Sequence, residues 1–314
     1  MTQMQQVLDV QSAALLAGDA KAMRDTVALP YRRVTSDLDL IIETEADAAR
    51  GVTAFTASLQ GLGVNHFIRL VTDAEYLNDH YLEGHYVTHA LRNATAMVPS
   101  YDNRMVLRLM DGQWRMVELV SNLSTARHWP VDMLRVAEAG AVDTGTHAQD
   151  ARRSAAEPLA LYQTFLDRLT DATLSKDFDA YIALCGLPYT SHIDAQDTLL
   201  RTPEDVRPFF DMTVDMITSG KADDFQRRAS QAEFLGSDLI CGYHTSHFIK
   251  DGTAALAPIK SRMILKRRGV TWALKSVTNA LSNAAYPYRA PEPSEALPTH
   301  REILERTKSW PTLH

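Results

Sequence analysis

The sequence has little cysteine, no long apolar run and no excess of positive charge. Two cysteines, Cys185 and Cys241, among 314 residues cannot build a disulfide framework or a four-cysteine zinc site. Their mostly apolar or small neighbours predict buried free thiols. No stretch approaches the roughly 18–20 apolar residues of a membrane span, and no basic segment precedes an apolar one within Met1–Ala17. The net charge of −7 argues against nucleic-acid binding. We therefore expect a cytoplasmic protein without a membrane or nucleic-acid partner.

What the sequence does contain is an internal repeat. Leu29, Pro30 and Tyr31 recur as Leu187, Pro188 and Tyr189, an offset of 158 residues. The same offset relates, without a gap, several further pairs: Gly84 and Gly242, His89 and His247, Arg104 and Arg262, Trp114 and Trp272. This unit is far longer than the roughly 20–50 residues of solenoid repeats. The chain therefore contains two domains of one fold.

The repeat predicts the boundaries of the domains, with the first copy over residues 1–125 and the second over 158–284. Residues 126–157, rich in Ala, Gly, Asp and Arg, are expected to form a linker. Residues 285–314 begin with several prolines and are expected to form an extended C-terminal arm that ends in a short helix.

Each copy shows the same order of helix and strand patterns. A helix (4–16 and 159–173) and a short second helix are followed by two strands, a long helix and four long antiparallel strands. Pro30 and Pro188 are expected to end the second helix, because proline lacks an amide hydrogen. Thr44 and Thr202 are expected to cap the long helix. Helices on one face of an antiparallel sheet are an α+β architecture.

This order of elements, with Leu-Pro-Tyr after the second helix and Gly-x-Trp before the last strand, resembles the nuclear-transport-factor-2-like (cystatin-like) superfamily. The resemblance covers both copies but neither linker nor arm. It implies two tandem cone-shaped domains, each with three helices packed on a curved antiparallel sheet around an apolar pocket. It also implies pairing of the two domains within the chain, and it leaves further homo-oligomers open. Because the superfamily includes isomerases, dehydratases, cyclases and non-catalytic proteins, the fold implies no single function.

Pocket chemistry requires polar residues at alternate positions of a strand. Thr190, His192 and Asp194 share one face of the first strand of the second copy. The resembled isomerases carry their catalytic aspartate near the end of this strand, which implies Asp194 as a base and His192 as its partner. The first copy has Arg32, Val34 and Ser36 at these positions. Such chemistry is therefore expected in the second copy alone; the alternative is that Asp194 begins a turn and His192 is half-exposed.

Tyr189 and His247 complete the candidate catalytic set as hydrogen-bond donors to a ligand oxygen. For both residues, a purely structural role in packing or hydrogen bonding is the alternative. His89 and His247 each lie four residues after a residue that the strand pattern places on the same face, His85 and Tyr243. Residues four apart on a strand are about 13 Å apart, too far for one metal ion. No metal site and no cofactor are expected.

Arginines also recur, with Arg69 and Arg104 matched by Arg227 and Arg262. Each is either an interior charge that binds an anionic ligand or a member of a cross-strand ion pair. The sequence thus indicates binding of an apolar small molecule in the cone pocket, with cofactor-free isomerase, lyase or cyclase chemistry in the second copy as one form of it. The alternative is a non-catalytic binding or scaffold pseudo-dimer that interacts with a protein partner. Whether the protein is an enzyme stays open.

Overall fold

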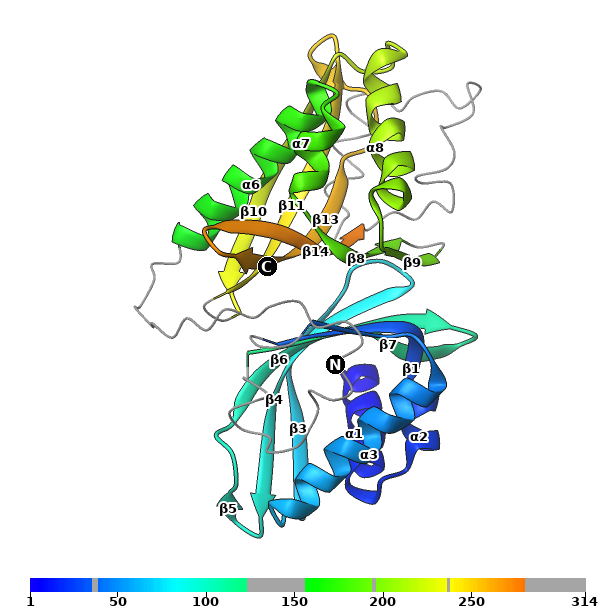
Figure 1. The fold of residues 1–314 in the computed structure, drawn as a ribbon, viewed down its shortest axis with the longest axis vertical. Coiled ribbons are helices and arrows are strands. Elements are labelled where there is room, and N and C mark those ends of the chain that lie inside the picture. Colours follow the sequence, from blue (N-terminus) through cyan, green and yellow to red (C-terminus); the bar gives the residue numbers. More distant parts are fainter. Residues whose placement is uncertain (36–38, 123–155, 194–195, 236–237, 280–314) are drawn as a thin grey trace. The chain divides into compact units, whose positions relative to one another are not determined.

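A computed structural model describes residues 1–35, 39–122, 156–193, 196–235 and 238–279. The predicted C-terminal arm and nearly all of the predicted linker lie outside these ranges. The chain divides into two compact units, one within Met1–Thr146 and the other within His147–His314. Each unit is an α+β domain in which the helices gather on one face of a curved sheet, as the sequence predicts (Figure 1).

The first unit contains a seven-stranded sheet of order β2-β1-β7-β6-β4-β3, with β5 paired to β4. Its helices are α1 Thr2–Ala17, α2 Ala20–Asp25 and α3 Glu45–Gly61. Its strands are β1 Val27–Val34, β2 Asp39–Ile42, β3 His66–Tyr76, β4 Tyr81–Arg92, β5 Thr95–Ala96, β6 Tyr101–Met110 and β7 Gln113–Ser121.

The second unit repeats this arrangement with a sheet of order β10-β11-β13-β14-β8-β9, and β12 pairs with β11. Its helices are α6 Ala156–Leu174, α7 Phe178–Ala183 and α8 Pro203–Thr218. Its strands are β8 Cys185–Ile193, β9 Gln196–Leu200, β10 Asp224–Phe234, β11 Leu239–Lys250, β12 Thr253–Ala254, β13 Ile259–Arg268 and β14 Thr271–Asn279. Neither unit contains, among its described residues, a helix long and apolar enough to cross a membrane.

The long helix begins where the sequence predicts in both units. Thr44 Oγ1 accepts a hydrogen bond from the backbone N–H of Asp47 at 3.1 Å, and Thr202 Oγ1 accepts one from Asp205 at 3.3 Å. The Asp205 carboxylate accepts hydrogen bonds in return from the N–H groups of Arg201 and Thr202, and these bonds lower the pKa of Asp205. Side-chain oxygens therefore satisfy backbone donors that the first turn leaves free.

The prediction that Pro30 and Pro188 end the second helix is wrong. The helices α2 and α7 end earlier, at Asp25 and Ala183, and the prolines lie inside β1 and β8. Each of these strands pairs in parallel with the last strand of its unit, and the pairing is irregular around the proline. A missing amide hydrogen costs nothing there, because the ladder makes no regular hydrogen bond at that point. The sheet is therefore mixed rather than wholly antiparallel.

A glutamine clamp joins the first helix to the sheet in both units. Gln5 Nε2 donates to the carbonyl of Arg69 at 2.8 Å, and Gln5 Oε1 accepts from the N–H of Val71 at 3.0 Å. Gln163 makes the same two bonds to Arg227 (3.0 Å) and Ala229 (2.8 Å). The clamp lies beside a break in strand register that also recurs, at Val71/Asp73 in β3 and at Ala229/Gln231 in β10. In both units, the same pair of hydrogen bonds therefore holds the edge strand, β3 or β10, against the first helix.

Candidate functional site

The face of the sheet that the helices cover is marked by a repeated glycine. A Cβ on Gly84 would lie 2.8 Å from Met4 Cε of α1, and one on Gly242 would lie 2.5 Å from the ring of Tyr162 in α6. Alternate residues of a strand share a face, so Tyr86 and Thr88 face the helices in the first unit. This inner face, together with the helices, surrounds a cavity in each unit.

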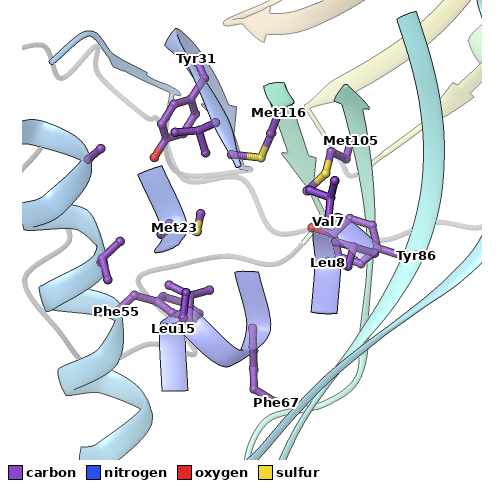
Figure 2. Packing of buried hydrophobic residues seen from close by; sticks show 14 of the residues in the cluster. Val7, Leu8, Leu15, Met23, Tyr31, Phe55, Phe67, Tyr86, Met105 and Met116 are labelled. Atoms are coloured by element: carbon purple, nitrogen blue, oxygen red, sulfur yellow. The ribbon is translucent and has the colours of Figure 1, made fainter. Parts of the chain in front are cut away.

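The cavity of the first unit has a volume of about 100 Å³ and lies between α3 and the inner face of its sheet. Figure 2 shows Met23, Tyr31, Phe55 and Met116 around this interior space. Most of the wall is apolar, with further contributions from Leu15, Leu40, Ile42, Val52, Phe67 and Leu119. Its polar members include Gln11, Arg33, Arg69, Tyr86, Tyr101 and Asn103. An apolar wall with a few polar groups is typical of a ligand site.

Arg33 enters this cavity from β1, next to Tyr31 and Thr35 on the same face. Its guanidinium carbon lies 5.7 Å from the ring centroid of Phe55. Its Nε is buried without a hydrogen-bond partner in the part of the chain that the structure describes. A buried donor of this kind is costly unless something else accepts its hydrogen.

Arg69, by contrast, is fully engaged with neutral groups. It donates to Ser12 Oγ at 2.9 Å, Gln11 Oε1 at 3.2 Å and the carbonyl of Leu8 at 2.9 Å, and its guanidinium carbon lies 5.8 Å from the ring centroid of Tyr86. Burial lowers the pKa of Arg69 and raises the pKa of Tyr86. The cavity wall therefore carries positive charge beside phenols that stay protonated at neutral pH.

The cavity of the second unit is smaller, about 70 Å³, and its polar groups differ. His244 occupies the position of Tyr86, and its Nδ1 lies 2.7 Å from the hydroxyl of Tyr162. Burial lowers the pKa of His244 to about 3, so the imidazole is neutral at pH 7. Arg227 also lines this cavity, whereas Ser191 stands where the first unit has Arg33. The second cavity thus retains one of the two arginines.

The predicted catalytic residues are not brought together. Tyr189 lines the cavity of the second unit, but His192 and His247 do not, and Asp194 lies outside the described residues. His192 Nδ1 instead lies 2.7 Å from Asp197 Oδ1 of β9. The expectation that His192 and His247 face the pocket is wrong, because the inner face of β8 carries Tyr189 and Ser191, and that of β11 carries His244 and Ser246.

The residues that sequence reasoning missed are Arg33, Tyr86 and His244, and the repeated glycines offered a signal for two of them. A glycine repeated within a strand indicates close approach of another element. The inner face could have been assigned from that signal: Tyr86 follows Gly84 by two residues, and His244 follows Gly242 in the same way.

Of the recurring arginines, Arg104 follows the ion-pair alternative. It lies across from His85 in the sheet register, and its Nη1 is 3.5 Å from Glu83 Oε1. Arg69 is buried and bonds neutral acceptors of the protein, so the anion-binding alternative stays a prediction for it. Within the described ranges, no three His, Cys, Asp or Glu side chains are grouped so that they could hold a metal ion.

Comparison with known proteins gives similarity in structure only. No protein-family model and no curated protein matches the sequence. An NTF2-like protein from Shewanella oneidensis is 11% identical, with a TM-score of 0.32, over 39% of this chain and 98% of its own. An NTF2-like protein with a cystatin-like fold from Novosphingobium aromaticivorans is 16% identical, with a TM-score of 0.32, over 40% and 84%. A domain with a cystatin-like fold from Nostoc punctiforme is 9% identical, with a TM-score of 0.32, over 49% and 86%.

Proposed function

We propose that the first unit binds a small, mostly apolar molecule in the cavity between α3 and its sheet. The observation that carries this proposal is the combination of an apolar wall with the polar groups of Arg33, Arg69 and three tyrosines. Arg33 also places in this wall a buried donor, its Nε, that has no partner among the described residues, and an acceptor on a ligand would satisfy it. The second cavity, smaller and without that arginine, supports the proposal less.

The cavity can be tested with probes that differ only in their head group. The full chain, labelled with ¹³C at its methionine methyl groups, is titrated with 4-methylbenzamide and 4-methylbenzoate. Met23 and Met116 line the cavity, so their methyl signals report a molecule that enters it. We expect at least one probe to shift both signals in a saturable way.

A blocking variant with a matched control assigns the binding to the cavity. Gly51 of α3 lines the cavity, and nothing lies within 4 Å of a Cβ placed on it. The equivalent residue of the second unit, Phe209, lines the smaller cavity there. Gly51→Phe should fill the space and abolish binding. Gly61→Phe, on the same helix but away from the cavity, should leave binding intact. Failure of both probes to shift Met23 and Met116, or unchanged binding in Gly51→Phe, would contradict the proposal.

The association of the two units with each other and the formation of homo-oligomers stay predictions, as does the location in the cytoplasm.

A further inference from the structure

Two neighbouring arginines of β1 lie on opposite faces of the sheet. Arg32 pairs with Asp39 of β2, with its Nε 2.9 Å and its Nη2 2.5 Å from Oδ1. Arg33 points into the cavity and has no ion pair among the described residues. One guanidinium therefore has its counter-charge within the protein, and the next one does not.

Two buried donors in the wall of the first cavity lack a hydrogen-bond partner among the described residues. Arg33 Nε and Gln11 Nε2 are both buried without a hydrogen-bond partner in the described residues, and both residues line the cavity. Both atoms are donors, so an acceptor is what the wall lacks. In the second unit, Ser191 and Leu169 occupy the equivalent positions. The same fold therefore forms without an arginine or an amide at these places.

The charge of the wall points the same way. Arg69 is hydrogen-bonded by neutral acceptors, and burial raises the pKa of Tyr31, Tyr86 and Tyr101, which keeps these phenols uncharged. Among the described lining residues, Asp47 is the one carboxylate, and it already bonds Thr44 Oγ1 at 2.6 Å and Arg50. The cavity thus has an excess of positive charge and of hydrogen-bond donors.

We infer that the ligand of the first unit is a monocarboxylic acid, bound as its carboxylate by the guanidinium of Arg33, with its apolar body against Phe55 and the rest of the wall. This inference rests on the proposed function and narrows it to one class of ligand. A planar guanidinium matches a carboxylate through two parallel hydrogen bonds. A phosphate ester is the less suitable anion, because a dianion must shed more water before it meets a mostly apolar wall.

The test compares three probes of one shape in the full chain: 4-methylbenzoate, 4-methylbenzamide and 4-methylphenyl phosphate. Their affinities are measured from the Met23 and Met116 methyl signals in the native protein, Arg33→Met and Arg33→Lys. We expect 4-methylbenzoate to bind native protein roughly tenfold or more tightly than the amide, since hydrogen bonds to a charged group have this strength. Arg33→Met should remove this preference, whereas Arg33→Lys, which keeps the charge but not the planar fork, should retain part of it.

The outcomes separate the two proposals. Equal binding of 4-methylbenzoate and 4-methylbenzamide, or a preference for the acid that survives in Arg33→Met, overturns the carboxylate inference and leaves the cavity function standing. Tighter binding of 4-methylphenyl phosphate than of 4-methylbenzoate also overturns it. If none of the three probes binds the native protein, the proposed binding function of the cavity is overturned as well. Circular dichroism and thermal unfolding confirm that each variant is folded.

Discussion

Replacement of Arg33 by methionine should stabilise the first unit, although it removes a charged side chain from a cavity. The structure gives both contributions to the change. The variant loses the contact with Phe55, 5.7 Å from the guanidinium carbon, which is worth about 0.5–1 kcal/mol at a partly exposed site. It also loses a buried Nε that has no partner among the described residues, and such a donor costs about 1–3 kcal/mol. The net expectation is a gain on the order of 1 kcal/mol.

Arg69→Met provides the opposite case within the same cavity. Its removal leaves the acceptors on Ser12, Gln11 and Leu8 without their donor, so we expect a loss of roughly 2–4 kcal/mol from the stability of the first unit. The two arginines line one cavity and have the same charge. Either substitution removes one positive charge from the cavity and so relieves the same repulsion between the two guanidinium groups. Opposite effects on stability would therefore reflect the difference in hydrogen bonding of Arg33 and Arg69 in the folded state.

Native-state hydrogen exchange in the full chain measures these changes unit by unit. Peptides from β4 and β6 report the first unit, and those from β11 and β13 report the second, which serves as an internal control. A gain of about 1 kcal/mol corresponds to a rise of roughly 2–8 °C in the Tm of the first unit. If Arg33→Met destabilises the first unit as much as Arg69→Met does, then the protein itself satisfies Arg33, and the expected gain in stability is refuted.

Three further predictions concern other parts of the fold. Gln5→Ala and Gln163→Ala should each destabilise its own unit by about 1–2 kcal/mol, because each removes two hydrogen bonds to an outer strand; hydrogen exchange that slowed, or that changed in both units, would contradict this. His244 has its pKa lowered to about 3 by burial, so the unfolded chain takes up a proton near pH 6.5 while the folded unit does not. The stability of the second unit should therefore fall by up to about 1.4 kcal/mol per pH unit as the pH drops below about 6.5, and His244→Phe should remove this part of the pH dependence. Burial raises the pKa of Cys185 to about 12, and Cys241 is also buried, so both thiols should resist alkylation at pH 8 until the chain is unfolded in urea.

The repeat made most of the fold predictable from the sequence. Both copies show the same cap before the long helix, Thr44 in one and Thr202 in the other. A pattern that occurs at equivalent positions of both copies is less often a coincidence than a pattern that occurs once. The prediction that Pro30 and Pro188 end a helix was wrong because a proline that ends a helix and a proline inside an irregular strand can have the same neighbours in sequence. Which of these occurs is decided by the partner strand, β7 or β14, more than eighty residues away along the chain.

The candidate site was less predictable. The alternation of side chains along a strand defines two faces of the sheet, but it does not show which face lies toward the helices. In β8, both faces carry polar residues, with Thr190 and His192 on one and Tyr189 and Ser191 on the other. Hydropathy therefore could not select the face toward the helices. The distinction between Arg32 and Arg33 lay equally outside the sequence, because it depends on which guanidinium reaches Asp39.

The breaks in strand register, at equivalent places in β3 and β10, have a consequence for how this protein can change. A bulge of one residue fixes which side chains face inward on both sides of it. Both units share this phase, so Tyr86 of β4 and His244 of β11, which pair with the bulged strands, line their cavities at equivalent positions. The two cavities therefore carry different side chains on the same strand register. We expect that exchange of Tyr86 and His244 changes the lining of each cavity and leaves the strand register unchanged.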